Sequence, residues 1–262
     1  MAGYECVRVS EKLDFDTFEF QFENLHYATE RHRTYVIFDV KPQSAGGRSR
    51  RLWGYIINNP NVCHAELILM SMIDRHLESN PGVYAMTWYM SWSPCANCSS
   101  KLNPWLKNLL EEQGHTLMMH FSRIYDRDRE GDHRGLRGLK HVSNSFRMGV
   151  VGRAEVEECL AEYVEASRRT LTWLDTTESM AAKMRRKLFC ILVRCAGMRE
   201  SGSSYTKSCV STCTAANFNL YVANTKISCC NSDLCNVSGS PRSVASIVVA
   251  MTMTLIGSAV CF

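Results

Sequence analysis

The stretch WSPCANC, Trp92–Cys98, places two cysteines three positions apart directly after a proline, and the chain holds no other C-x-x-C pair. Such a pair acts as a redox dithiol at a helix N-terminus, as half of a structural zinc knuckle, or as two ligands of a catalytic zinc ion. A knuckle needs a second pair of ligands, which disfavours that alternative. The chemistry of the pair therefore depends on residues elsewhere in the chain.

His64 and Glu66 lie upstream, in the stretch CHAE, and 27 residues separate Glu66 from Pro94. Together with Cys95 and Cys98 they form the pattern H-x-E…P-C-x-x-C, which is the signature of zinc-dependent nucleobase deaminases. One imidazole would begin one predicted helix and two thiolates would begin the next, where the positive helix end favours their charge. We therefore expect one catalytic Zn²⁺ with three protein ligands and a fourth position for water.

Glu66 is expected to be the catalytic residue. It cannot be a fourth ligand if water is to hold that position, and two residues beyond His64 its carboxylate can move protons between the water, the base ring and the departing amine. Taken singly, His64 would more often be a packed or capping histidine and the two cysteines would be core thiols. The combined pattern favours hydrolytic deamination.

Hydrophobic periodicity predicts an α/β fold with a mixed sheet covered by helices on both faces. We expect helix 10–25 to be capped by Ser10 and helix 95–114 to be interrupted near Pro104. Residues 46–47, two glycines, are expected in a hairpin loop. The other predicted helices cover 64–77, 134–142, 154–167 and 180–195, and the five predicted strands cover 34–40, 51–58, 83–92, 115–125 and 146–152.

The composition sets bounds on function. With 262 residues, of which 45% are hydrophobic and 21% charged, the chain can bury a full core. The net charge is only +4, so nucleic-acid binding is not indicated by charge alone. Three local clusters, residues 48–51, 168–169 and 183–187, either bind phosphate groups or form solvated faces.

The stretch TWYMSWSPCANC, ending at Cys98, resembles the AID/APOBEC polynucleotide cytidine deaminases, and most closely their agnathan (lamprey) branch. The likeness runs over about residues 4–197. It implies a cytidine-deaminase fold for the domain 1–197, with a five-stranded sheet and about six helices. It also implies conversion of cytosine to uracil in single-stranded DNA during immune diversification or antiviral defence. RNA remains an alternative substrate.

The same resemblance implies a pocket around the zinc site. Trp92 and Tyr125 would flank a flipped cytosine, and Ser93 would contact its edge. Asp126 would contact the preceding base, which implies a preference for thymine there. Without the zinc motif beside them, the two aromatic residues would more often be core side chains. The substrate-contacting residues expected from the resemblance are Arg31, His32, Thr34, Asn58, Asn59, Ala65, Trp92, Ser93, Tyr125 and Asp126.

The composition changes after Gly197. Residues 198–243 are rich in Ser, Thr, Asn and Cys, and the stretch CCNSDLCN resembles the closing motif of three-finger surface proteins, which are often GPI-anchored. In a luminal tail the resemblance would pair Cys213 with Cys229, and Cys230 with Cys235. Only the last part of such a domain is present, so we expect this tail to be poorly structured.

Residues 244–262 carry no charge and are just long enough to span about 30 Å as a helix. They could form a GPI signal, a tail anchor, or part of a fusion or misassigned exon. The N-terminal residues show no apolar signal region, so we expect a cytoplasmic or nuclear protein, with membrane association as an alternative. The rival functions are a non-catalytic nucleic-acid binder and a membrane-anchored surface protein. The oligomeric state is left open.

Overall fold

The computed structural model describes residues 6–25, 28, 30–44, 49–58 and 63–193, and the backbone of β7 (Leu220–Val222) and β8 (Thr225–Ile227). The chain divides into two compact units, residues 1–192 and 193–262. In the second unit, β7 and β8 form an antiparallel pair. Within the described residues, no helix is both long enough and apolar enough to cross a membrane.

Several sequence predictions lie outside the described residues. They concern the predicted loop at 46–47, one candidate pocket residue, the tail cysteines and the apolar terminal segment. These residues are Gly46, Gly47, Asn59, Cys213, Cys229, Cys230, Cys235 and 244–262.

The first unit is built on one mixed sheet with the strand order β1-β3-β2-β4-β5-β6. The β4–β5 and β5–β6 pairs are parallel and the others antiparallel. The strands are β1 (Val7–Val9), β2 (Tyr35–Pro42), β3 (Leu52–Ile57), β4 (Tyr84–Trp92), β5 (Thr116–Arg123) and β6 (Phe146–Val150). The helices are α1 (Phe15–Phe22), α2 (Ala65–Ser79), α3 (Ala96–Lys107), α4 (Arg129–Lys140), α5 (Arg153–Glu162) and α6 (Thr177–Val193).

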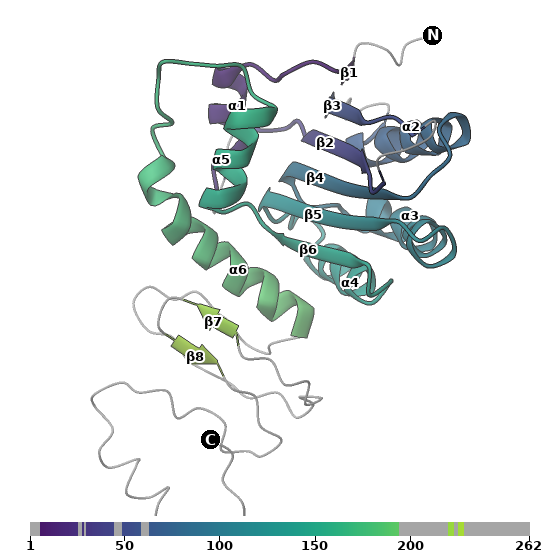
Figure 1. The fold of residues 1–262 in the computed structure, drawn as a ribbon. Helices are drawn as coiled ribbons and strands as arrows, with labels where there is room; N and C mark the ends of the chain where they lie inside the picture. The colour runs from purple at the N-terminus through teal and green to yellow at the C-terminus, as the bar shows by residue number, and fades with distance from the viewer. Residues whose placement is uncertain are drawn as a thin grey trace, which may run out of the picture. The chain divides into compact units, whose positions relative to one another are not determined.

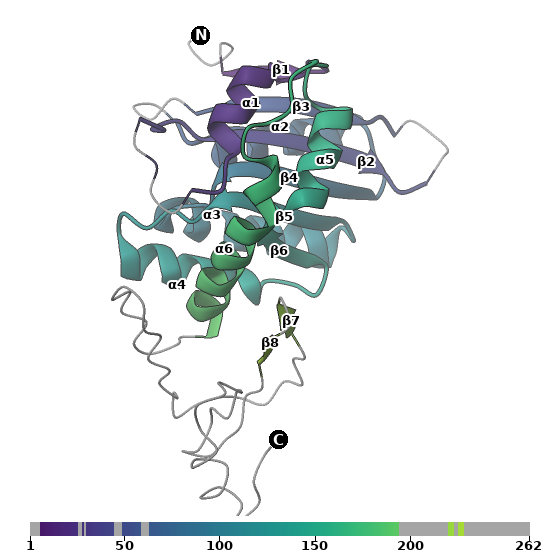
Figure 2. The ribbon, with the colours of Figure 1, turned by 90° about the vertical axis from the view of Figure 1, so that its left-hand side faces the viewer.

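The helices form a layer on each face of this sheet, which confirms the predicted architecture. Helices α2, α3 and α4 cover one face, and α1, α5 and α6 cover the other (Figures 1 and 2). Alternation along β2 explains how one strand serves both layers. Val36 and Phe38 are buried in the core that includes α2 and α3, whereas Tyr35 and Ile37 are buried in the core that includes α1 and α5.

The prediction of five strands was one short, because β1 forms an additional edge strand. It pairs with β3, with Val7 opposite Ile56. Gly54 makes this pairing possible, since a Cβ on it would lie 2.0 Å from the Arg8 carbonyl oxygen and its φ is 146°. Three residues are too few to show a strand period, so the sequence pattern did not reveal β1.

The predicted start of the first helix was also wrong. Helix α1 begins after Asp14, whose carboxylate accepts a hydrogen bond from the Thr17 N–H at 2.8 Å. Ser10 instead has a φ of 57° and donates its backbone N–H to the Trp53 carbonyl, where it ends the β1–β3 pairing. The pairing of β1 with β3 thus places Ser10 at the end of a strand, and the helix cap lies at Asp14 instead.

Helix α3 continues through Pro104, contrary to the predicted interruption. A proline inside a helix lacks the N–H that would bond the carbonyl four residues earlier. Here that residue is Ser100, which is exposed, so solvent can satisfy its carbonyl group. A π-helical turn over residues 108–112 follows directly. The chain then turns at Gly114, whose φ is 76°.

The N-terminal segment packs against residues that come late in the domain. Leu13 donates its N–H to the Tyr163 carbonyl at 2.9 Å and accepts from the Glu165 N–H at 2.8 Å. The Trp173 indole N–H donates to the Glu19 carbonyl in α1 at 2.8 Å. Helix α1 is therefore held in place by the segment that follows α5.

Asp39 is a carboxylate buried within β2, only 2% exposed. It accepts hydrogen bonds from Arg51 at 2.9 and 2.8 Å and from the Tyr163 hydroxyl, and it forms an ion pair with Lys41. Burial alone would raise the pKa of Asp39, but these partners outweigh burial and hold it below its usual value of 3.8. The network joins β2, β3 and the end of α5.

We expect Asp39→Asn to lower the free energy of unfolding at pH 7 by about 1–3 kcal/mol, because the substitution weakens hydrogen bonds to a buried charged group. Since the folded pKa lies below the unfolded one, the contribution of the charge is present above the unfolded value and disappears as the pH falls through the folded value. Denaturant titrations at pH 7 and pH 3 measure both effects.

The control is Glu162→Gln, because this exposed carboxylate lies 4.0 Å from the same arginine and should contribute little. If the difference in the free energy of unfolding between wild type and Asp39→Asn is the same at pH 7 and pH 3, packing rather than charge stabilises this position.

Candidate active site

Three helices begin at one edge of the sheet. Strands β3 and β4 are both antiparallel to β2, and β5 is parallel to β4, so β3, β4 and β5 run in the same direction. Their carboxyl ends therefore meet at one edge, where α2, α3 and α4 start, as in other open α/β sheets. His64 is the N-cap residue of α2, and Cys95 is the N-cap residue of α3.

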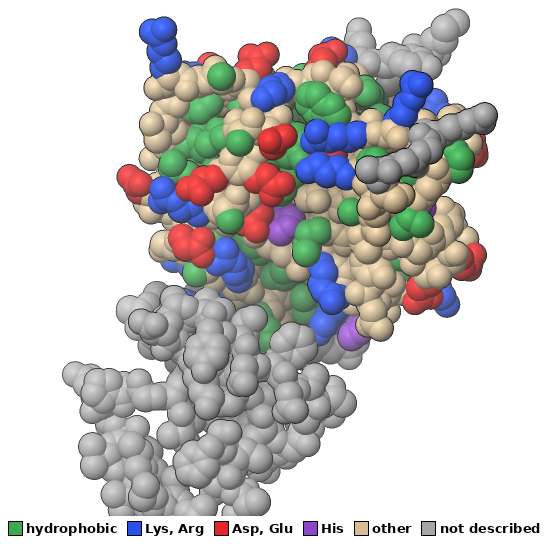
Figure 3. Space-filling model, viewed as in Figure 1, with side chains coloured by type: hydrophobic (Ala, Val, Ile, Leu, Met, Phe, Trp, Pro, Cys, Tyr) green, Lys and Arg blue, Asp and Glu red, His purple; other side chains and the backbone are tan. Residues whose placement is uncertain are grey.

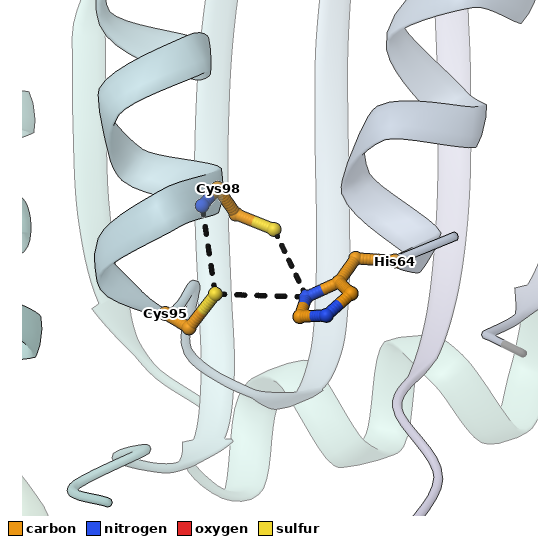
Figure 4. Close-up of side chains that lie close together, drawn as sticks. All are labelled: His64, Cys95 and Cys98. Atoms are coloured by element: carbon orange, nitrogen blue, oxygen red, sulfur yellow. Dashed lines mark hydrogen bonds between the residues drawn. The ribbon is translucent and has the colours of Figure 1, made fainter. Parts of the chain in front are cut away.

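His64, Cys95 and Cys98 converge at this edge, and Figure 4 shows their side chains pointing toward one another. The His64 Nδ1 atom lies 3.5 Å from the Cys95 sulfur and 3.2 Å from the Cys98 sulfur. A tetrahedral zinc ion with ordinary bond lengths separates a nitrogen and a sulfur ligand by about 3.5 Å. The donor set and its spacing therefore fit zinc, and no other such group occurs among the described residues.

The two thiols occupy different electrostatic environments. The hydrogen bond with Cys98 lowers the pKa of Cys95 to about 5, and the Cys98 backbone N–H also points to the Cys95 sulfur at 3.5 Å. The neighbouring Cys95 sulfur, together with burial, raises the pKa of Cys98. Thiolates are the form that binds metal. The first turn of α3 thus favours the thiolate form of Cys95.

Glu66 lies in the first turn of α2 and is only 3% exposed. Burial raises the pKa of its carboxyl to about 7. One of its oxygens, Oε2, is buried without a hydrogen-bond partner. A buried carboxylate oxygen normally has a partner. This oxygen is therefore available to a group that enters the site.

The predicted aromatic pair does come together. Trp92, at the end of β4, and Tyr125, after β5, meet edge to face with their ring centroids 6.2 Å apart. The Arg123 guanidinium lies 4.5 Å from the centre of the Trp92 ring, and the indole N–H donates to the Arg31 carbonyl at 3.1 Å. Ser93 accepts the Tyr125 N–H at 2.9 Å. The Trp92 ring is thus held by several contacts, and the Tyr125 backbone is held by Ser93.

Asp126 is held by two basic side chains. Its carboxylate lies 3.1 Å from His133 Nε2 in α4 and 2.9 Å from the Lys187 ammonium in α6. Beside it, a cavity of about 300 Å³ is lined by residues from the start of α3 and from the loop before α4. The lining residues are Cys95, Ala96, Asn97, Tyr125, Arg127, Asp128 and Asp132.

The remaining predicted pocket residues have mainly structural contacts. Asn58 accepts the Thr34 N–H through its side chain at 2.8 Å and donates its own N–H to the Thr34 carbonyl, which fixes these two residues together. Arg31 pairs with Glu23 at 2.8 Å. Ala65 is fully buried at the start of α2, and His32 is exposed in the loop before β2.

The basic cluster at residues 183–187 is partly neutralised. Lys187 pairs with Asp126, and Arg185 pairs with Glu178, so two of its cations already have acidic partners. Arg169 of another cluster pairs with Asp16. Among the described side chains visible in Figure 3, acidic and basic groups are interspersed rather than collected by sign. The acidic partners of Arg169, Arg185 and Lys187 favour the solvated-face alternative for the clusters 168–169 and 183–187.

Two buried residues of this region were not predicted. Arg123 is 1% exposed and lies against Trp92, and Asp132, also 1% exposed, contacts the start of α3. The sequence did contain a signal for the second, because Asp128 and Asp132 are four residues apart at the start of a helix. Helix α4 begins at Arg129 rather than at residue 134, and Gly131 and Gly135 obscured its first turn.

Two families match this chain. Residues 11–192 match the family described as APOBEC3, cytosine deaminase domain, and residues 178–236 match the family of snake toxin and toxin-like proteins. The second match supports the resemblance predicted for the tail. The two matches overlap in α6, where Ala181, Met184, Leu188 and Ile191 are buried in the core of the first unit.

Individual relatives are similar over part of their length. The chain is 30% identical over 138 residues to the C->U-editing enzyme APOBEC-2 of Mus musculus, which covers 52% of this chain and 59% of that protein. It is 30% identical over 118 residues to the DNA dC->dU-editing enzyme APOBEC-3Ca of Felis catus, and the match covers 44% of this chain and 60% of that protein. It is 29% identical over 163 residues to the DNA dC->dU-editing enzyme APOBEC3 of Rattus norvegicus, and the match covers 60% of this chain and 36% of that protein.

The matched region is thus less than two thirds of the length of these relatives. The family match nevertheless covers most of this chain and includes the whole converging set of histidine, cysteines and buried glutamate. On this evidence the chain belongs to the AID/APOBEC family of cytosine deaminases.

Proposed function

We propose that this chain is a zinc-dependent deaminase that converts cytosine to uracil in single-stranded polynucleotide, and in DNA in particular. The observation that carries the proposal is the placement of a buried carboxylate oxygen without a partner, on Glu66, beside three side chains whose spacing fits zinc. A site built only for structure would have four protein ligands and no free carboxylate.

His64, Cys95 and Cys98 would hold the zinc ion, which when bound supplies Lewis-acid activation of water. Glu66 takes up a proton from that water and delivers protons to the ring nitrogen and to the departing amino group. Water thereby adds at C4 of cytosine, the C–N bond to the amino group breaks, and uracil and ammonia are the products. Because Glu66 is buried, bulk water does not compete for these protons.

Trp92 and Tyr125 support the proposed substrate class. Their rings meet at the edge where the candidate ligands converge, and an aromatic wall of this kind contributes about 1–3 kcal/mol for each stacked base. A base inside a duplex cannot reach such a wall, so the substrate must be unpaired. The names of the cat and rat relatives specify DNA, which favours DNA over RNA for this chain.

The proposal is tested by incubating the zinc-loaded full chain with single-stranded oligonucleotides that each contain one cytosine, as DNA and as RNA. We expect uracil in the DNA strands. Uracil only in RNA would replace DNA by RNA as the substrate. The absence of uracil in both would contradict the proposed activity and favour a non-catalytic nucleic-acid binder.

Asp126 is proposed to select thymine as the base that precedes the target. In TC, CC, AC and GC oligonucleotides we expect TC to be deaminated fastest, and Asp126→Ala to reduce that preference because an acceptor is removed. Glu130→Gln, which removes an exposed charge nearby, serves as control. Equal rates in all four contexts for the wild-type chain would contradict this assignment.

The proposal extends to membership of the agnathan branch, to a role in immune diversification or antiviral defence, and to a location in the cytoplasm or nucleus. The branch assignment rests on the resemblance of the chain, in which the TWYMSWSPCANC stretch fits the motif of the family as a whole. Fractionation of cells that express the tagged full chain tests the location, and recovery with membranes would contradict it.

A further inference from the structure

Asp132 connects the metal-ligand helix to the loop that follows β5. It is 1% exposed, and each of its carboxylate oxygens accepts a backbone hydrogen bond. Oδ1 accepts from the Ala96 N–H at 2.7 Å, and Oδ2 accepts from the Asp128 N–H at 2.9 Å. Ala96 directly follows the ligand Cys95. A single side chain in α4 thus touches both segments.

The contact to Ala96 satisfies one of the first N–H groups of α3. The first N–H groups of a helix have no partner within it. The Cys98 N–H points to the Cys95 sulfur, and the Ser99 N–H bonds to the Cys95 carbonyl at 2.8 Å. The Ala96 N–H and that carbonyl belong to one rigid peptide plane. Asp132 and the Ser99 N–H therefore fix the plane that carries Cys95 from opposite sides.

Glycines in α4 bring Asp132 to this position. Gly131 and Gly135 are four residues apart and lie on one face of the helix. A Cβ on Gly135 would lie 2.7 Å from the Ser99 Cβ, and a Cβ on Gly131 would lie 3.3 Å from the Ala96 Cβ. Larger residues would push α4 away from α3, so the close approach of the two helices depends on these positions.

The loop between β5 and α4 is fixed at both ends. The Tyr125 N–H bonds to Ser93 at one end, and the Asp128 N–H bonds to Asp132 at the other. The cavity described above lies between this loop and the start of α3. Movement of Asp132 would therefore change both the orientation of the ligand Cys95 and the wall of that cavity.

We propose that Asp132 is a positioning residue. It orients the Cys95–Ala96 peptide for the metal, and it fixes the position of the loop that carries Tyr125 and Asp126 relative to that peptide. The part concerning the loop rests on the proposed deaminase function, whereas the part concerning metal affinity does not. Residues that orient metal ligands through such contacts typically contribute about 10–100-fold to metal affinity or activity. We expect a contribution of about this size from Asp132.

The test compares wild type, Asp132→Ala, Asp132→Asn and the control Glu130→Gln, which changes the same charge in the same turn at an exposed position. Zinc affinity of the full chain is measured by competition with a chromogenic chelator, without substrate. Thermal unfolding is recorded with and without zinc, and deamination is measured in the four sequence contexts.

We expect Asp132→Ala to weaken zinc binding by about 10–100-fold. Asparagine has one acceptor in place of two, so Asp132→Asn should show a smaller loss, and Glu130→Gln none. In active variants the ratio of rates between contexts should also change. If the alanine variant does not fold, a loss of zinc affinity in Asp132→Asn that is absent from Glu130→Gln supports the proposal.

Wild-type zinc affinity in both Asp132 variants would overturn the proposal. So would an equal fall in the melting temperature with and without zinc, because that is the result of a purely structural role. A wild-type chain that binds zinc but does not deaminate would contradict the proposed function and leave the comparison of zinc affinities valid.

Discussion

Replacing Glu66 by glutamine is expected to abolish deamination while zinc remains bound. Glutamine keeps the size of the side chain but cannot accept and return a proton, and positioned acid–base groups contribute about 10²–10⁴-fold in rate. Uracil formation in the single-stranded DNA assay measures the loss, and metal analysis of the purified variant measures the zinc. We expect a rate at least about 100-fold lower and one zinc per chain.

Glu78→Gln is the matched control, because Glu78 is an exposed glutamate in the same helix. It should keep wild-type activity. Activity of Glu66→Gln within tenfold of wild type would mean that another group carries the protons. Loss of zinc from Glu66→Gln would mean that the carboxylate is a ligand rather than a proton carrier.

The second large effect is expected from Cys98→Ala. This substitution leaves two of the three protein ligands, so the chain should be purified with little zinc, and deamination should fall to background. The variant should also lose the stabilisation that bound metal gives to the folded state, which is about 4 kcal/mol when free zinc exceeds its dissociation constant about 1,000-fold. Metal analysis and thermal unfolding with and without zinc measure these effects.

Cys159→Ala is the matched control, because Cys159 is fully buried like Cys98 but lies in α5, away from the converging ligands. It should lose some stability through a small cavity and keep its zinc. If zinc raises the melting temperature of Cys98→Ala as much as that of wild type, the three side chains are not the metal site.

The convergence of His64, Cys95 and Cys98 at one edge of the sheet, with Glu66 buried in the same region, was predictable from the sequence because each lies at a helix start in a short motif. His64 and Glu66 are two residues apart, and Cys95 and Cys98 are three apart, so local helix geometry limits where each pair points. The strands that bring the two pairs together were predictable from their β-branched and aromatic runs. The overall α/β architecture followed from the same patterns.

The parts that were missed depend on contacts between distant segments. The strand β1 exists because Gly54 allows a close approach, and Ser10 ends that strand rather than capping a helix. Asp132 contacts Ala96, which lies 36 residues away in sequence. No local pattern of hydrophobic residues encodes such pairings, so the sequence indicated the candidate site residues and left most of their supporting contacts undetermined.

The docking of α1 against the segment after α5 has a consequence for synthesis on the ribosome. Residues up to Cys98 complete the ligand set, but Trp173, which holds Glu19, follows about 75 residues later, or about 4–15 s at ordinary rates of translation. During that interval the nascent chain carries the three candidate metal ligands while the contacts of Trp173 with α1 have not yet formed. A chain released after Asp132 but before Tyr163 would therefore contain the candidate site residues and still lack the contacts that Tyr163, Glu165 and Trp173 make with its N-terminal segment.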